Sequence, residues 1–352
     1  MKVKIYGAGS IGNHLAQASR RMGWDVVVVD PNREALRRMK EDIYPTRYGA
    51  WDEAIQLCTP ADEPQGGFDG IILGTPPDVR MKVARAAIAE RPKFMLLEKP
   101  LCAPSCEGLT EFFIESNEAG ILSFVGYDHA VSAGIEWVSG MLGQEMIGKI
   151  LTLDVEFREY WGGIFKAHPW LSGPADTYLG FTERGGGASG EHSHALHLWL
   201  VLALAAGLGT CTKASGYLHM KQDGGAFYDD LAAFTLETSL GVTGRVVQDV
   251  VTQPTRKWAR IQGTDGFIEW ICNGTPDGDL VRWKQGDKPE GSLGFPKKRP
   301  DDFYRELQHI AEALKEPHLY KNSPISLDTG LAVMEILRSA SGESLKKINP
   351  LF

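Results

Sequence analysis

A glycine-rich run near the N-terminus is the first part of the chain whose residue types and spacing indicate chemistry. Gly7, Gly9 and Gly12 form the pattern GxGxxG, directly after a β-like run and before a helix-like one. The first glycine suits a tight turn, the second lets the backbone approach a pyrophosphate, and the third allows a helix to pack closely on a strand. Together with the N–H groups at the start of the helix, which include those of Ser10 and Ile11, this run predicts a dinucleotide site.

An acidic residue after the next β-like run fits the same site. The run Val26–Val29 ends on Asp30, at the distance where a carboxylate reaches the adenosine ribose hydroxyls. A carboxylate there would repel the 2′-phosphate of NADP, so NAD is the expected cofactor. Arg33, together with Asn32, could reshape the pocket enough to admit NADP, and that alternative stays open. Arg33 is therefore counted among the candidate cofactor contacts.

A lysine follows a third apolar run. The run Phe94–Leu97 ends in Glu98, Lys99 and Pro100. Because ligands of open α/β sheets bind beyond the carboxyl ends of the strands, Lys99 is aimed at the cofactor cleft. There it could donate a hydrogen bond to a substrate hydroxyl and help to move its proton. The alternative is a surface lysine at the end of a strand.

Length and composition place these motifs in a globular chain of more than one domain. The 352 residues exceed what one hydrophobic core usually holds. A formal net charge of -8 gives no positive field for nucleic acid or an anionic membrane, so neither is an expected partner. The N-terminus shows no signal-peptide pattern, and the most apolar stretch, 196–208, is too short to span a bilayer. A cytoplasmic location is therefore expected.

The pattern of elements changes near residue 127. Residues 2–126 alternate short β-rich runs with amphipathic stretches, which predicts a doubly wound α/β Rossmann domain over 1–127. After residue 128 the strand candidates are 150–160, 214–220, 231–238, 242–251 and 257–262, and the helix candidates are 192–205 and 302–315. This predicts an α+β domain over 128–352 on a large, mostly antiparallel open sheet, whose last helices could pack back on the first domain. The aperiodic segment 162–187 is predicted to be a long loop.

Taken together, the motifs resemble those of the Gfo/Idh/MocA family, which includes glucose-fructose oxidoreductase and inositol dehydrogenase. The matching features are Gly7–Gly12, Gly74–Asp78, Glu98–Pro100, Gly185–Gly187 before a histidine-containing helix, and Gln262–Gly266. The resemblance covers nearly the whole chain and implies a nicotinamide cofactor and a sugar, polyol or nucleotide-sugar substrate. It also implies that Lys99 is the catalytic lysine, that Thr75, Pro76 and Glu98 lie at the cofactor, and that the Lys99–Pro100 bond can be cis.

A histidine after the second glycine run is the other expected catalytic group. Family members place an acid there and, four residues on, a histidine that exchanges the substrate proton, whereas here Glu191 and His194 are three apart. Residues three apart on a helix still share a face, so both side chains could project into one pocket. We expect His194 to accept the proton and Glu191 to assist it or to hold a hydroxyl. A shifted alignment of this segment with the family pattern leaves His192 as an alternative proton acceptor. Separately, Arg80 stands where the family often has histidine.

The same segment offers candidate metal ligands in Glu191, His192, His194 and His197. Pairs of ligands on a helix prefer i, i+4 spacing, and the side chains of residues 192 and 194 point apart. We therefore predict no metal site. His197 lies in a run of Leu and Trp and is expected to pack in the core.

Substrate contacts are expected from loops opposite the nicotinamide. Aromatic faces suit the apolar side of a sugar, and His and Arg side chains suit its hydroxyls. The candidates are Tyr127, His129, Arg158, Tyr160 and Trp161.

The expected function is NAD(P)-dependent hydride transfer at a hydroxyl or carbonyl carbon of a sugar-like substrate. One alternative is an NAD-dependent glycosidase on the same scaffold, which oxidises its substrate only transiently. Another is a non-catalytic NAD-binding regulator, in which Lys99 and His194 would have no proton to move. The open sheet of the second domain needs a cover, so a homodimer or homotetramer is expected.

Overall fold

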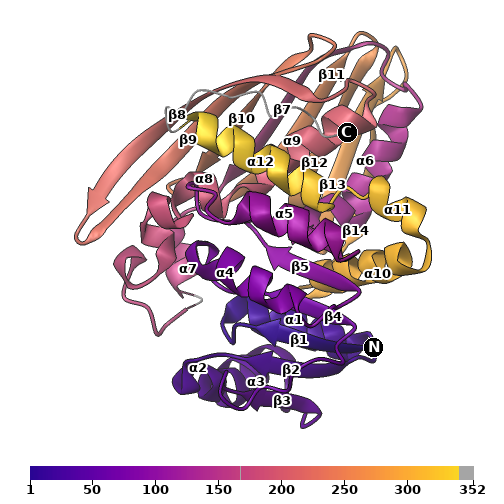
Figure 1. Ribbon diagram of the computed structural model, residues 1–352. Coiled ribbons are helices and arrows are strands. Elements are labelled where there is room, and N and C mark those ends of the chain that lie inside the picture. The colour runs from indigo at the N-terminus through magenta and orange to yellow at the C-terminus, as the bar shows by residue number, and fades with distance from the viewer. Residues whose placement is uncertain (167, 341–352) are drawn as a thin grey trace. The chain divides into compact units, whose positions relative to one another are not determined.

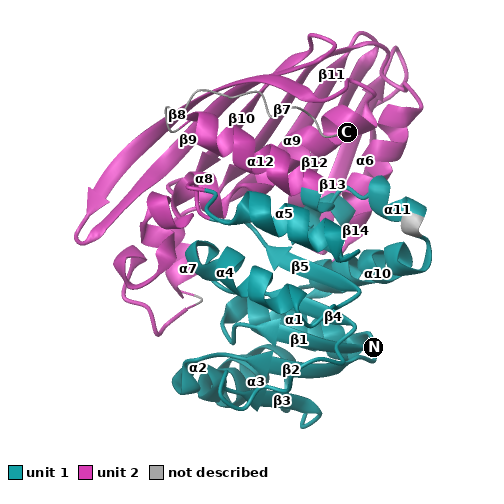
Figure 2. Cartoon of the chain, in the orientation of Figure 1, with its two compact units in different colours: residues 1–102, 106–131, 298–327 teal, residues 103–105, 132–297, 328–352 magenta. Residues whose placement is uncertain are grey.

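The computed structural model describes residues 1–166 and 168–340, which form two compact units. Unit 1 contains Met1–Cys102, Cys106–Val131 and Lys298–Leu327, and unit 2 contains Ala103–Ser105, Ser132–Lys297 and the residues from Asp328 onward (Figure 2). Unit 1 is thus made of three separate segments of the chain. No helix among the described residues is long and apolar enough to cross a membrane.

Unit 1 is built on a parallel sheet of six strands in the order β3-β2-β1-β4-β5-β6 (Figure 1). The strands are β1 (Lys2–Tyr6), β2 (Asp25–Val29), β3 (Ile55–Cys58), β4 (Gly70–Leu73), β5 (Phe94–Glu98) and β6 (Leu122–Gly126). The helical elements between them are α1 (Ser10–Arg21), α2 (Arg33–Arg38), η1 (Met39–Ile43), α3 (Tyr44–Tyr48), α4 (Pro77–Ile88) and α5 (Leu109–Glu118). The strand order reverses between β1 and β4, and ligands of doubly wound sheets bind at such a point.

The central strands of this sheet are buried along their whole length. Every residue of β4 and β5 is buried, as expected for parallel strands with crossover helices on both faces. This confirms the doubly wound fold predicted from the alternation of strands and helices. The short edge strand β3 was not predicted.

Two late helices belong to unit 1. They are α10 (Asp301–Lys315) and α11 (Pro317–Lys321). Helix α10 packs against α1, β6 and the 3-10 turn η2 (Asp128–Val131). The ring of Phe303 stacks on that of His14 in α1, with 4.9 Å between the centroids. The apolar face of α10 is thus buried on the parallel sheet domain, although this helix follows the whole second sheet in sequence.

Unit 2 is built on an eight-stranded sheet in the order β14-β13-β12-β11-β7-β10-β9-β8 (Figure 1). The strands are β7 (Ile150–Arg158), β8 (Cys211–Asp223), β9 (Ala226–Thr238), β10 (Thr243–Asp249), β11 (Arg256–Gly263), β12 (Gly266–Thr275), β13 (Gly278–Gln285) and β14 (Gly291–Pro296). All neighbouring pairs are antiparallel except β7 and β10. The mostly antiparallel sheet predicted from the sequence is confirmed.

Helices cover one face of this sheet. The helices of unit 2 are α6 (Ala133–Gly143), α7 (Trp161–Lys166), α8 (Gly187–Glu191), α9 (His194–Ala205) and α12 (Leu327–Ala340). Helix α9 packs on β7 and β10, and α6 packs on β12, β13, β14 and α9. The buried indole of Trp199 anchors α9 because its Nε1–H donates to the carbonyl of Leu153 at 2.8 Å.

The segment 162–187, predicted to be a loop, contains regular structure. Most of α7 lies in it, followed by the 3-10 turns η3 (Pro174–Asp176), η4 (Tyr178–Gly180) and η5 (Thr182–Arg184). These short elements lack a readable period. Residues of α7 and η4 are held by a core cluster with α8 and β9, whose buried members are Trp161, Leu179, Ala188, Ala226, Tyr228 and Val250.

Candidate functional site

Four candidate cofactor groups follow four neighbouring strands of the parallel sheet. Asp30 follows β2, Gly7 follows β1, Thr75 comes just after β4, and Lys99 follows β5. The strand order places β2, β1, β4 and β5 next to one another, and the register pairs Tyr6 with Leu73 at the carboxyl end. All four groups therefore lie along one edge of the sheet, in the order given.

The backbone at Gly7, Gly9 and Gly12 has the conformation and close contacts that the GxGxxG pattern predicts. Gly7 has a φ of +110°, a conformation that L side chains rarely adopt. A Cβ on Gly12 would lie 1.9 Å from the carbonyl oxygen of Gly7, so α1 packs directly on the turn. A Cβ on Gly9 would meet nothing within 4 Å, and Gly9 is the N-cap of α1 with no side chain satisfying the first N–H groups. The turn is therefore open where a pyrophosphate would approach the helix N-terminus, beside Ser10 and Ile11.

Asp30 is fixed by the backbone on both of its oxygens. The N–H of Ala8 donates to Oδ2 and the N–H of Asn32 donates to Oδ1, both at 2.8 Å. A carboxylate has about four lone-pair sites, so this arrangement leaves acceptor capacity for ribose hydroxyls. The two backbone donors hold the side chain in one orientation.

A hollow in unit 1 lies beside this carboxylate. The hollow is lined by Arg33, Leu36, Arg37, Lys40, Glu41, Leu57, Cys58, Thr59 and Asp62. It adjoins Asp30, whose N–H donates to the carbonyl of Cys58 at 3.2 Å. Arg37 is held by Glu34 and Glu41, at 2.8 and 2.7 Å, whereas Arg33 is exposed. Arg33 is thus the basic residue of the hollow that fits the NADP alternative, and Asp30 fits NAD.

The loop after β4 presents Thr75 and Pro76. Pro76 is exposed, and its φ and ψ of -54° and 148° make it the N-cap of α4. The Oγ1 of Thr75 is buried and has no hydrogen-bond partner among the residues that the structure describes. A bound ligand would satisfy that hydroxyl.

Lys99 and Glu98, at the end of β5, differ in their exposure to solvent. Lys99 is half-buried, whereas Glu98 is 5% exposed and its carboxylate packs on Gly126 of β6. The Lys99–Pro100 bond is cis, as the resemblance implied. Burial raises the pKa of Glu98 to about 7, against the opposing effect of Arg80 and Lys99. Glu98 is therefore a buried acid beneath the candidate catalytic lysine.

A second buried acid, Glu306, reaches the same region from α10. It is fully buried, and neither carboxylate oxygen has a hydrogen-bond partner within the described part of the chain. Burial, together with the charges of Glu98, Asp128 and Asp302, raises its pKa well above the ordinary value. Sequence reasoning missed Glu306, because a glutamate is usually exposed on a helix. Its spacing from Phe303 and Ile310 nevertheless places it on the apolar face of α10.

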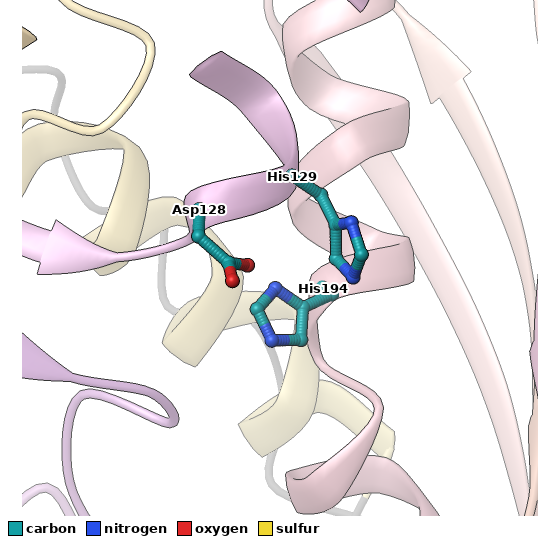
Figure 3. Close-up of side chains that lie close together, drawn as sticks. All are labelled: Asp128, His129 and His194. Atoms are coloured by element: carbon teal, nitrogen blue, oxygen red, sulfur yellow. The ribbon is translucent and has the colours of Figure 1, made fainter. Parts of the chain in front are cut away.

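The three residues after β6 are buried in unit 1. Tyr127 is fully buried, and Asp128 and His129, both on η2, are 5% and 8% exposed. Figure 3 shows the side chains of Asp128 and His129 on this turn and that of His194 at the start of α9. Tyr127 and His129 were predicted to contact substrate, and both are buried in unit 1.

The predicted helix 192–205 corresponds to α9, but the expectation that Glu191 and His194 lie on one helix is wrong. Helix α8 ends at Glu191 and α9 begins at His194, so the two side chains do not share the face of one helix. The chain turns because the carbonyl of His192 accepts a bond from the side chain of Gln248 and another from the N–H of Ala195. His194 is half-buried, with its ring 6.1 Å from that of Phe157.

His197 is a core residue, as expected. It is 1% exposed, and its Nε2 lies 3.4 Å from the Oγ1 of Thr329 in α12.

Asp229 holds the glycine turn before His194, and no pattern in the sequence predicts this contact. Its carboxylate accepts bonds from the N–H of Ser189 at 2.7 Å and from the hydroxyls of Ser189 and Thr182 at 3.0 and 2.7 Å. A Cβ on Gly187 would lie 2.0 Å from this carboxylate, which explains the glycine there. Burial raises the pKa of Asp229 to about 6. Forty residues separate Asp229 from Ser189, so only the fold brings them together.

The three candidates at the end of β7 do not form one surface. Arg158 pairs with Asp249 through its Nε at 2.5 Å, and the alternation of the strand places it on the face opposite Phe157 and therefore away from His194. Tyr160 is 45% exposed, whereas Trp161 is buried and packs on Tyr228 with 4.5 Å between ring centroids. The Nε1–H of Trp161 finds no acceptor among the described residues, so it could serve a ligand.

Several solved oxidoreductases have the fold of this chain. An NAD-binding oxidoreductase from Klebsiella pneumoniae has a TM-score of 0.75 and 14% identity, over 97% of this chain and 96% of the other. The WlbA dehydrogenase from Bordetella pertussis, in complex with NADH and UDP-GlcNAcA, has a TM-score of 0.70 and 19% identity, over 97% and 95%. Levoglucosan dehydrogenase, in complex with NADH and L-sorbose, has a TM-score of 0.73 and 17% identity, over 98% and 97%.

No family model and no curated protein matches the chain. At these identities the likeness to solved structures shows the fold. Over nearly its whole length, the chain is structurally similar to NAD-binding oxidoreductases of the Gfo/Idh/MocA type, as its motifs predicted.

Proposed function

We propose that the protein is an NAD(H)-dependent oxidoreductase that acts at a hydroxyl or carbonyl carbon of a sugar, polyol or nucleotide sugar. The observation that carries this proposal is the order of Asp30, the glycine turn, Thr75 and Lys99 along one sheet edge. Neighbouring strands lie about 4.8 Å apart, so these four strand ends span about 14 Å, a length that suits an extended dinucleotide. The adenosine would lie toward Asp30 and the nicotinamide toward Lys99.

The residues of the chain have distinct roles in this proposal. Bound nicotinamide would supply or accept the hydride at the substrate carbon. Lys99 donates a hydrogen bond to the substrate oxygen and takes or returns its proton, and His194 of unit 2 is the second proton-handling group. Glu191 and the Nε1–H of Trp161 are donor or acceptor groups for substrate hydroxyls.

The ligands of the similar structures support the substrate class. The WlbA dehydrogenase holds NADH with UDP-GlcNAcA, and levoglucosan dehydrogenase holds NADH with L-sorbose. A sugar or nucleotide sugar is therefore the first class of compound to test. Glycerol and inositol extend the panel to polyols.

The proposal is tested by following NADH absorbance while the purified protein is offered NAD⁺ with each compound of the panel. We expect NADH to accumulate with at least one sugar, polyol or nucleotide sugar, and Lys99→Ala to abolish that signal. Release of free sugar from a glycoside without NADH accumulation would instead indicate an NAD-dependent glycosidase. Tight NADH binding with no turnover of any compound would indicate a regulator.

A further inference from the structure

Arg80, in the first turn of α4, is a charged residue buried in unit 1. It is 2% exposed in the folded chain and is one of the largest fully buried side chains. Its side chain is enclosed by other residues of unit 1. A buried guanidinium is costly unless its N–H groups are well satisfied, so its contacts indicate its role.

The guanidinium of Arg80 donates to main-chain carbonyls of two separate segments. One terminal nitrogen donates to the carbonyls of Glu98 and Pro100 and lies 3.5 Å from that of Leu101. The other terminal nitrogen donates to the carbonyl of Thr75. The planar fork of arginine presents several N–H groups in fixed directions, which a lysine cannot reproduce.

These acceptors are placed on both sides of Lys99. The carbonyls of Glu98 and Pro100 belong to the residues before and after it, and Thr75 lies in the loop after the neighbouring strand β4. One side chain therefore fixes the backbone around Lys99 and ties it to the candidate cofactor loop. The positive charge of Arg80 also faces the buried carboxyl of Glu98.

We propose that Arg80 is a positioning residue, a clamp that holds Lys99 and the Thr75 loop at a fixed separation. The proposal rests on the proposed function, in which Lys99 acts on a substrate held by the cofactor. Without the clamp, the turn at Glu98–Leu101 and the loop at Thr75 would move independently. The reacting groups would then be misplaced, and misplacement lowers turnover more than it lowers cofactor binding.

Hydrogen exchange measures the clamp without reference to turnover. The variants are Arg80→Ala and Arg80→Lys, and the control is Arg85→Ala, which removes an exposed arginine on the same helix that pairs with Glu115 at 2.5 Å. We expect faster exchange in peptides covering both 74–79 and 97–103 in the two Arg80 variants and in neither peptide of the control. Arg80→Lys retains the charge and provides the test if Arg80→Ala fails to fold. Unchanged exchange at both segments would overturn the clamp.

Turnover measured on the same variants tests the consequence for Lys99. We expect kcat to fall by about tenfold or more in both Arg80 variants while the NADH dissociation constant stays nearly constant. Guanidinium added at concentrations well below those that denature should restore part of kcat to Arg80→Ala and none to Lys99→Ala. If exchange is faster but kcat is normal, the role of Lys99 in the proposed function is contradicted. If turnover is lost without faster exchange, or guanidinium does not rescue it, the clamp is contradicted.

Discussion

The carboxylate of Asp30 accepts a hydrogen bond from the backbone N–H of Ala8 at 2.8 Å. This contact joins the end of β2 to the glycine turn after β1, the two segments that would hold the adenosine ribose and the pyrophosphate. With the N–H of Asn32 on its other oxygen, the carboxylate is held in one orientation by the backbone. Preorganisation of this kind lowers the cost of binding.

The first prediction concerns the choice between NAD and NADP. The charge of Asp30 opposes a 2′-phosphate, so NADH should bind at least about tenfold more tightly than NADPH, a difference of about 1.4 kcal/mol. Asp30→Ser should reduce that preference, and Asp25→Asn, at the other end of β2, should leave it unchanged. Fluorescence titrations with the two cofactors measure it. Equal or tighter binding of NADPH by the wild-type protein would mean that Arg33 dominates the pocket.

The second prediction separates two glycines of the same turn. A methyl group on Gly9 meets nothing within 4 Å, so Gly9→Ala should keep the unfolding temperature and weaken NADH binding. A methyl group on Gly12 would lie 1.9 Å from the carbonyl oxygen of Gly7, so Gly12→Ala should lower both stability and binding. Thermal unfolding and NADH titration of both variants test this. A Gly9→Ala variant with full affinity would show that no phosphate passes over this residue.

The third prediction is a pH dependence of stability that arises from Glu306. Its pKa is raised by burial, so the folded state binds this proton more tightly than the unfolded chain does. The stabilisation is therefore complete below a pH of about 4.5, the ordinary value, and is lost as the pH rises toward the folded-state pKa. Glu306→Gln should unfold at a higher temperature than wild type in alkaline buffer, with a smaller gain or none in acid.

The control for this prediction is Glu118→Gln, which changes an exposed glutamate at the end of α5 in the same unit. It should leave the pH dependence of the unfolding temperature unchanged. If Glu306→Gln changes the unfolding temperature by the same amount at every pH, the pKa of Glu306 does not differ between the folded and unfolded states, which would contradict this prediction.

More of the fold than of the site could be predicted from the sequence. Alternating strands and helices identified the parallel sheet because its buried strands are continuous apolar runs. Strands β12 and β13 were missed, although a period of two is present in β12, where Ile268 and Trp270 are fully buried and alternate with Phe267 and Glu269. Helix α6 was not predicted either, because the glycines within it obscure the helical pattern of apolar residues.

Some site residues could also be placed from the sequence, and others could not. Gly7, Asp30 and Lys99 could be placed from the sequence because each follows a strand, and apolar runs reveal where strands end. The break between α8 and α9 was missed because no proline marks it. It depends on the side chain of Gln248, which comes from a distant strand, and no local rule for helices contains that information.

The fourth prediction concerns assembly. The predicted dimer or tetramer would use the face of the unit 2 sheet that α9 and α6 leave uncovered. Tyr217 of β8 is 62% exposed, which is unusual for a large apolar ring. Light scattering at micromolar concentration should give the mass of a dimer or tetramer, and Tyr217→Glu should reduce it. A monomeric wild-type protein would contradict this assignment.

The central claim is that Lys99 and His194 move the substrate proton during hydride transfer to a nicotinamide cofactor. The most direct test is steady-state turnover of Lys99→Ala and His194→Ala on the substrate found in the panel, with NADH affinity measured in parallel. The account predicts that kcat falls by about 100-fold or more in each while NADH affinity changes little, and that His197→Ala loses stability instead. Near-normal kcat in Lys99→Ala would contradict the account, and near-normal kcat in His194→Ala with loss in His192→Ala or Glu191→Ala would move the proton acceptor to that residue.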